Sequence, residues 1–253
     1  MKKLLSGSSL FFLMVFFVTR ALSAEPEADY QAGMKALAMG DFATALGRLE
    51  AALGADPSSV RYGSEYRQAV ILAKEYDRSL KFFDKLVAGH PNSANAYLNY
   101  GFAYVDKIPT AGAITQVILA NTALSQFTKS IELSPSWIAH YTRGNSYLFW
   151  PRIFGRAKLG VADLEAALKM QQAEKKQPFH VRVFISLGDG YWKMDDLARA
   201  RQTWEEGLRQ YPDNVELQAR LSRDGDGLKT YIDGVLDPSK RVDTNLKDLW
   251  LSK

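Results

Sequence analysis

The sequence predicts an all-α fold built from repeated helix pairs, and three observations lead to it. Three stretches, near residues 32–57, 66–91 and 187–212, share a pattern of small, apolar and proline positions that fits a repeat of about 34 residues. Apolar residues in them recur with the period of a helix, as in residues 45–53. A turn that contains glycine, Gly40-Asp41-Phe42, separates the first two helices. Because one helix pair cannot bury its apolar face alone, the repeats are expected to stack into an α-solenoid.

This pattern resembles the tetratricopeptide repeat. The matching residues are Ala32-Gly33-x-x-Ala36…Ala45…Leu49…Ala52…Pro57, Tyr66-Arg67…Val70…Ser79…Phe83…Leu86…Pro91 and Leu187-Gly188-x-x-Tyr191…Ala200…Trp204…Gly207…Pro212. The likeness covers about residues 26–214 and is strong in repeats one, two and five. It implies a right-handed superhelix of about five helix-turn-helix repeats, whose first helices line a concave groove that binds an extended peptide or a partner helix.

Residues 1–24 predict a signal peptide. Lys2 and Lys3 precede an apolar run at residues 10–18, and Ala21-Leu22-Ser23-Ala24 offers small residues to a signal peptidase. The run is far shorter than the roughly 20 residues that span a bilayer, so cleavage is favoured over a membrane anchor. The sequence contains no cysteine, which excludes a lipid attached at the leader. We therefore expect a periplasmic protein that is not a lipoprotein.

Charge and composition exclude several other classes of function. The leader carries Lys2, Lys3 and Arg20 without an acid, so its removal takes the formal net charge from +4 to +1. A chain of this charge gives no reason to expect nucleic acid as a partner. The absence of cysteine excludes disulfides and thiolate metal sites. The remaining length suffices for one extended repeat domain with a continuous core.

The repeat domain is expected over residues 25–214. Its repeats are predicted near residues 26–59, 60–93, 94–136, 137–178 and 179–214. In repeat three, 22 residues separate the two small residues of the predicted helix crossing, Gly101 and Ala123, where repeat one has 12. Repeat four has 16, so insertions are placed near residues 106–120 and 149–156. Both fall at the turn between the first and second helices of neighbouring repeats, and we expect their apolar side chains to pack together into a lobe.

Residues 215–253 are predicted to form C-terminal capping helices and a tail. Short helices are expected around residues 215–222 and 228–236, because a terminal repeat must cover the open end of the stack. A helical spacing then puts four apolar residues of the tail on one face: Val242, Leu246, Leu249 and Trp250. We expect this face to fold back as part of the cap, with docking on a partner as the alternative.

No set of residues points to catalysis. His90, His140 and His180 fall at repeat junctions, without the grouping that a helical metal site uses. The run Asp224-x-Asp226-Gly227 begins like a calcium loop but lacks the later ligands. We therefore expect a non-enzymatic protein without a metal or cofactor.

Binding residues are predicted on the groove face of each first helix. The residues three before and one after the crossing position lie four apart, on one face of the helix. These pairs are Tyr30 and Met34, Ser64 and Gln68, Leu98 and Phe102, Tyr141 and Asn145, and Ile185 and Asp189. One turn further on, the face continues with Leu72, Val105, Phe149 and Trp192, and the second insertion adds Trp150, Phe154 and Arg156. For each of these side chains, packing against a neighbouring helix is the alternative.

Two functions agree with these features. The first is an exported interaction module or scaffold that holds a peptide or protein partner of a cell-envelope complex in its groove. The second is a periplasmic carrier or sensor of an apolar small molecule or lipid, held between the insertions of repeats three and four. A closed apolar cavity of about 300 Å³ or more between the insertions would favour the carrier.

Overall fold

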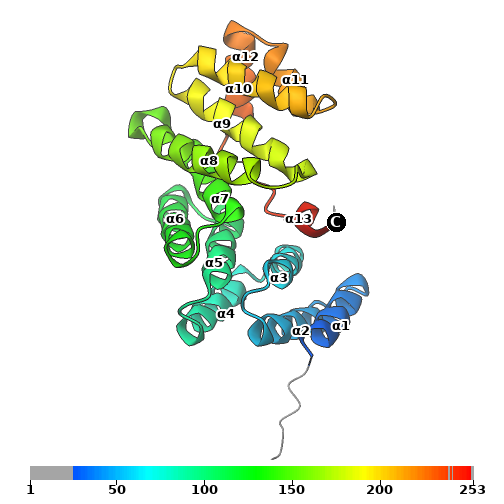
Figure 1. The fold of residues 1–253 in the computed structure, drawn as a ribbon. Helices are drawn as coiled ribbons and strands as arrows, with labels where there is room; N and C mark the ends of the chain where they lie inside the picture. Colours follow the sequence, from blue (N-terminus) through cyan, green and yellow to red (C-terminus); the bar gives the residue numbers. More distant parts are fainter. Residues whose placement is uncertain (1–24, 239, 241, 252–253) are drawn as a thin grey trace, which may run out of the picture.

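A computed structural model describes residues 25–238, 240 and 242–251 of the chain, and the predicted signal peptide, residues 1–24, lies outside the described residues. The described part contains thirteen α-helices, three short 3₁₀ helices and no strand (Figure 1). The prediction of an all-α solenoid is confirmed.

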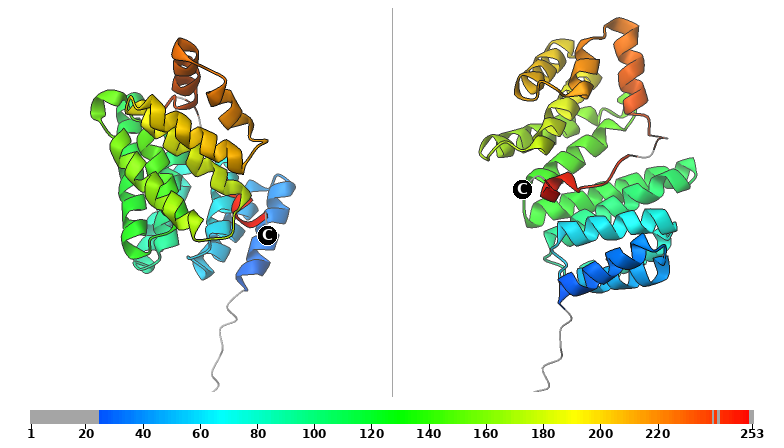
Figure 2. Two further views of the ribbon diagram at one scale, coloured as in Figure 1. Left: turned by 45° about the horizontal axis from the view of Figure 1, so that its top comes forward. Right: turned by 90° about the vertical axis from the view of Figure 1, so that its right-hand side faces the viewer.

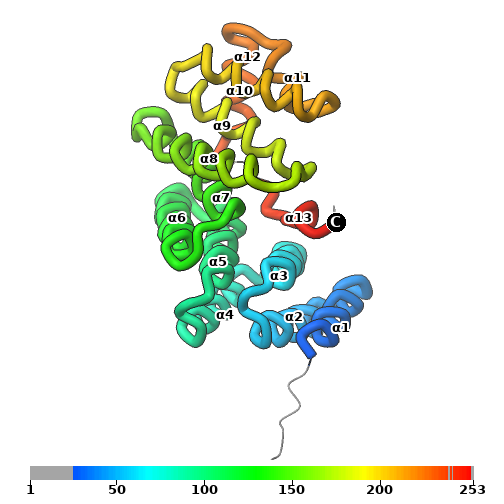
Figure 3. Tube along the Cα trace, viewed as in Figure 1, coloured from blue at the N-terminus to red at the C-terminus, as the bar shows by residue number. Residues whose placement is uncertain are grey.

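Ten helices form the five repeats as successive pairs. The pairs are α1 (Pro26–Ala38) with α2 (Phe42–Ala55), α3 (Val60–Ala73) with α4 (Tyr76–Gly89), α5 (Ala94–Lys107) with α6 (Ala113–Leu133), α7 (Trp137–Leu148) with α8 (Ala157–Gln172), and α9 (Val181–Lys193) with α10 (Leu197–Gln210). The other elements are η1 (Ile108–Thr110), η2 (Arg152–Phe154), η3 (Pro178–His180), α11 (Val215–Leu221), α12 (Gly225–Val235) and α13 (Asp248–Leu251). The pairs stack in chain order into an elongated molecule (Figures 2 and 3).

Polar side chains set where several helices begin. The Asp41 carboxylate accepts a hydrogen bond from the Thr44 amide at the start of α2, and the Ser59 hydroxyl accepts one from the Tyr62 amide at the start of α3. The same contact occurs at α5, α7, α10 and α11. Such a cap satisfies a free amide of the first turn and stabilises a helix by about 1 kcal/mol. The caps thereby stabilise the first turns of these six helices.

A glycine allows close contact in four of the five helix pairs. It is the eighth residue of α1, α5, α7 and α9. A Cβ added to Gly101 of α5 would lie 2.3 Å from the ring of Phe127 in α6, and one added to Gly188 of α9 would lie 2.1 Å from Trp204 in α10. No larger residue fits at such a separation. In α3 the eighth residue is Arg67, and α3 packs more closely on α5 than on its own partner, α4.

The apolar core runs along the stack in two large clusters. One joins repeats one to three and includes Tyr66 and Phe83. The other joins repeats four and five to the C-terminal helices and includes Trp204 and Ile232. α11 and α12 therefore cover the open end of the stack with side chains that belong to the second cluster.

The two insertions approach each other but do not form a packed apolar lobe. The first adds η1 and the early turns of α6, and the second adds η2. The contact near them is polar: the Arg156 guanidinium of the second insertion donates to the side-chain oxygen of Asn121, the residue that follows the first insertion, at 2.9 Å. Ile114 and Ile153 remain 81% and 90% exposed. The prediction of an apolar lobe is wrong, because no other helix among the described residues covers the apolar side chains at the start of α6.

Candidate functional site

The C-terminal residues 242–251, called the tail below, lie against the first helices of repeats two to five. We use "groove" for the surface of α3, α5, α7 and α9 that the tail contacts. Figures 1 and 2 show the red tail passing back from α12 and placing α13 between α3 and α9. The tail does fold back, but it lies in the groove and not on the open end of the stack, where the sequence placed it. The tail lies there because the groove provides hydrogen-bonding partners for its polar groups and an apolar cluster for Leu246.

A buried arginine–aspartate pair forms the floor of the groove. Arg67 of α3 is fully buried, and its Nη1 lies 3.0 Å from Oδ2 of Asp106 in α5, which is 3% exposed. Nη2 of Arg67 donates to the main-chain oxygen of Thr244 at 3.1 Å, and the Thr244 hydroxyl donates to Oδ1 of Asp106 at 2.5 Å. Burial lowers the pKa of Arg67, against the charge of Asp106, which raises it. The tail thus completes the hydrogen bonds of a charged pair that is shielded from water.

Leu246 is the most deeply buried apolar side chain of the tail, and Leu249 and Trp250 pack against the same cluster. Leu246 is 2% exposed and belongs to a cluster with Leu98 and Phe102 of α5 and Phe127 of α6. Its amide donates to the Ser64 hydroxyl of α3 at 3.3 Å. Burying a leucine side chain stabilises a contact by about 2 kcal/mol, so this residue contributes much of the attachment.

Charged residues of the tail extend the contact along the groove. Lys247 Nζ lies 3.7 Å from Oε2 of Glu65 in α3, whose side chain is 4% exposed. Asp248 Oδ2 lies 2.7 Å from Nη2 of Arg182 in α9. Leu249 packs against an apolar cluster formed by residues of α7, α8 and α9. The tail therefore connects repeats two to five by contacts that run from one end of the groove to the other.

Some of the predicted binding residues lie beside the tail. They are Ser64, which accepts the hydrogen bond from Leu246, and Leu98, Phe102, Val105 and Tyr141, which belong to the apolar clusters that contain Leu246 or Leu249. Tyr141 also stacks on Trp137, with ring centroids 5.2 Å apart.

Other predicted residues are taken up by packing within the stack. Those in or against the two large core clusters are Tyr30, Met34, Phe149, Ile185 and Trp192. The Asn145 side-chain oxygen accepts a hydrogen bond from Ser186 at 2.9 Å. Asp189 forms an ion pair with Arg220, with Nε 2.7 Å from Oδ1.

The last predicted residues lie apart from the tail contacts or at the second insertion. Gln68 is half-buried, and Leu72 is 61% exposed. Trp150 meets Phe154 edge to face with ring centroids 5.9 Å apart, and the Arg156 guanidinium lies 3.7 Å from the centre of the Trp150 ring. The structure thus does not gather all the predicted residues into one site.

Four charged residues of the groove are absent from the sequence-based binding predictions: Glu65, Arg67, Asp106 and Arg182. Arg67 holds the crossing position that is glycine in the other four repeats. A charged side chain at a position that is normally buried needs a buried partner, and this departure from the pattern is the signal that could have found it. Asp106 was assigned to the first insertion, whereas it is the last but one residue of α5.

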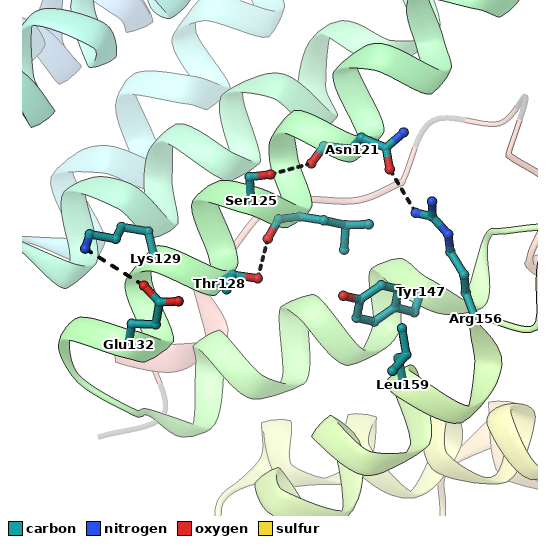
Figure 4. A pocket seen from close by; sticks show the side chains of 9 residues that line it. Asn121, Ser125, Thr128, Lys129, Glu132, Tyr147, Arg156 and Leu159 are labelled. Carbon is teal, nitrogen blue, oxygen red and sulfur yellow. Dashed lines mark hydrogen bonds and ion pairs between the residues drawn. The ribbon is translucent and has the colours of Figure 1, made fainter.

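A hollow of about 580 Å³ lies between α6, α7 and α8, as Figure 4 shows. Its lining residues are Asn121, Leu124, Ser125, Thr128, Lys129, Glu132, Tyr147, Arg156 and Leu159. Most of these are polar or charged, and several are exposed to solvent. The hollow is therefore not the closed apolar cavity that a carrier of lipid requires.

Within the ranges that the structure describes, no helix combines the length and the apolar character needed to cross a bilayer. The same residues contain no group of three or more histidine and carboxylate side chains that could hold a metal ion. His140 pairs with Asp163 at 3.0 Å, and His180 Nδ1 accepts the Gln177 amide at 3.3 Å.

Comparison with known proteins agrees with the repeat pattern. The family model described as tetratricopeptide repeat matches residues 30–94. Among solved structures, TTC0263, a thermophilic TPR protein in Thermus thermophilus, has a TM-score of 0.56 and 21% identity, covering 81% of this chain and 99% of that chain. A tetratricopeptide repeat protein from Parabacteroides merdae ATCC 43184 has a TM-score of 0.54 and 14% identity, covering 83% of this chain and 73% of that chain.

A third structure is YrrB, described as a TPR protein with an unusual peptide-binding site. It has a TM-score of 0.52 and 14% identity, covering 77% of this chain and 91% of that chain. None of the curated proteins matches this chain. At these identities the likeness concerns the fold, which over most of the chain is that of a tetratricopeptide repeat solenoid.

Proposed function

We propose that this protein is a non-enzymatic interaction module that holds an extended segment of a protein partner in its groove. One observation carries the proposal: two main-chain groups and four side chains of residues 244–248 find partners on the groove surface. Main-chain contacts combined with pockets for particular side chains are the means by which peptide-recognition surfaces bind extended chains.

The comparisons support a protein or peptide as the partner. Proteins with this repeat are generally interaction modules, and one solved structure of similar fold is described by its peptide-binding site. Because fold alone does not establish function, the argument for this chain rests on its own groove and tail.

The place of action in this proposal is the periplasm, where the partner is part of a cell-envelope complex. The support is the leader pattern, with Lys2 and Lys3 before the apolar run at residues 10–18 and small residues up to Ala24. Cell fractionation with N-terminal sequencing tests it. We expect a soluble periplasmic chain that begins at Ala24 or Glu25, and an uncleaved chain in the inner membrane would contradict the location.

The groove itself is tested with a peptide that has the sequence of residues 242–251. Residues 239–241 of the full chain are replaced by a protease recognition sequence, and the purified protein is cut there. The labelled peptide should then bind saturably in place of the severed tail, as measured by fluorescence anisotropy. A peptide of the same composition in scrambled order is the control. Failure of the cut, folded protein to bind the peptide would contradict the proposed function.

A further inference from the structure

The tail occupies the surface that the proposed function assigns to a partner. We infer that the tail is a built-in competitor, and that the partner presents an extended protein segment of the same chemical pattern. That pattern is a hydroxyl side chain, an aliphatic side chain two residues later and a carboxylate two residues after that. The inference rests on the proposed function and adds the partner's recognition pattern and its regulation.

Each position of the pattern has its own receptor group. The hydroxyl of Thr244 donates to the buried carboxylate of Asp106, and the carboxylate of Asp248 faces Arg182 at 2.7 Å. Leu246 fills the apolar site between them. The other contacts, to the Thr244 oxygen and the Leu246 amide, involve only the main chain. Any sequence can make main-chain contacts, so selectivity depends on side chains. The three side chains of the pattern are supported by Lys247 at Glu65 and by Leu249 and Trp250 at the apolar clusters.

The groove offers an occupant charged partners that become shielded from water when it is filled. Arg67, Asp106 and Glu65 are each no more than 3% exposed with the tail in place. Buried charged groups are costly unless they are paired and hydrogen-bonded. A partner segment that makes the same contacts as the tail provides hydrogen bonds to Arg67 and Asp106. A basic residue at the position of Lys247 pairs with Glu65, as Lys247 does. The groove is therefore suited to exchange one occupant for another.

The tail can leave without loss of the helices that precede it. α12 is held by Leu228 and Ile232, which are buried in the C-terminal core cluster independently of the tail. Within α13, Leu251 is 71% exposed and adds little to the attachment. Covalent connection gives the tail an effective concentration in the millimolar range for a short linker. A separate segment with the same contacts must therefore bind the intact chain more weakly than a chain whose tail is released.

The test compares the full chain with two variants of its tail. Leu246→Glu puts a charge into the apolar site and releases the tail, and Leu251→Glu places the same charge at an exposed residue as the matched control. Affinity for the labelled peptide of residues 242–251 is measured by anisotropy, with circular dichroism to verify the fold. We expect the Leu246→Glu chain to bind the peptide about tenfold more tightly than the wild-type chain, and the Leu251→Glu chain to match the wild type. If Leu246→Glu does not fold, the protease-cut chain takes its place.

Peptide variants test the recognition pattern. Replacing the threonine, leucine or aspartate that correspond to Thr244, Leu246 and Asp248 should each weaken binding at least about fivefold. Replacing the leucine that corresponds to Leu251, which is 71% exposed, should not. Equal affinity of the released and wild-type chains would overturn the competition while leaving the proposed function intact. Absence of binding by both released forms would contradict the proposed function itself. Concentration-dependent dimers formed by tail exchange would assign the groove to a second copy and overturn the inference of a separate partner.

Discussion

This molecule contains two buried arginine–aspartate pairs, and they differ in where their remaining hydrogen-bonding groups find partners. Arg220 of α11 donates from Nε and Nη2 to both oxygens of Asp189 in α9, each at 2.7 Å. Burial lowers the pKa of Arg220, yet the charge of Asp189 outweighs it and the pKa lies above its ordinary value. Arg67 makes a contact of 3.0 Å with Asp106, and burial takes its pKa below the ordinary value.

The difference separates a structural ion pair from a binding surface. In the Arg220–Asp189 pair, both carboxylate oxygens of Asp189 accept hydrogen bonds from Arg220, so two helices of the stack form the pair without the tail. The pair of Arg67 leaves one guanidinium nitrogen and one carboxylate oxygen for Thr244 of the tail. The two pairs are equally buried. They differ in how many of their hydrogen-bonding atoms bind a third segment of the chain.

Arg220→Met is expected to have the largest effect on stability. It leaves Asp189 buried without its cation, which lowers the free energy of unfolding by about 3–5 kcal/mol. Urea unfolding followed by circular dichroism measures the change. Arg209→Met removes an arginine whose side chain is 66% exposed, and this control should change stability by less than about 0.5 kcal/mol. A loss of stability below about 1 kcal/mol for Arg220→Met would contradict the claim that Arg220 is the partner that Asp189 depends on in the folded protein.

Gly101→Leu tests the crossing position that Arg67 occupies in α3. In repeat three a side chain at this position collides with Phe127, since even a Cβ would lie 2.3 Å from its ring. Overpacking of this kind should cost about 3 kcal/mol and lower the temperature of unfolding. Gly54→Leu is the control, because no atom lies within 4 Å of a Cβ added there. Unchanged thermal stability of Gly101→Leu would mean that the position tolerates side chains in every repeat.

Arg67→Met should cost less than Arg220→Met, about 2 kcal/mol. Loss of the guanidinium leaves Asp106 buried, but release of the tail lets water reach it, which limits the penalty. Hydrogen exchange of the amides in residues 243–251 should become faster, whereas it should not change in Arg209→Met. The comparison between the two pairs fails if the tail amides exchange as slowly as in the wild type, or if the loss of stability equals that of Arg220→Met.

The smallest effect concerns pH and His180 in η3. Burial lowers the pKa of His180, so below its ordinary value of about 6.5 the unfolded chain takes up a proton that the folded chain does not. Stability should therefore fall as pH decreases from about 7 to 5. Both arginine pairs keep their cations over this range, so His180→Gln should reduce the slope of urea midpoint against pH. An unchanged slope would assign the pH dependence to other groups.

The helix crossings could be predicted from the sequence because glycine recurs at the same place in the first helix of four repeats, even where an insertion lengthens the turn that follows. Gly101 and Gly188 lie where two helices touch, and a single sequence reveals this through spacing alone. The apolar lobe between the insertions could not be predicted correctly. Composition marks Ile114 and Ile153 as apolar, but whether anything covers them depends on where neighbouring helices end.

The repeated helix pairs follow from the sequence alone, since the period of apolar residues and the small residues at most helix crossings are local properties of each repeat. The position of the tail, in contrast, depends on contacts between distant parts of the chain. Arg67, Asp106 and Thr244 are far apart along the chain and meet through two hydrogen bonds and an ion pair. Amphipathic spacing predicts that Leu246 is buried, but several surfaces could bury a leucine. The charges on the groove floor favour this surface, because there the tail also makes hydrogen bonds to charged groups that it shields from water.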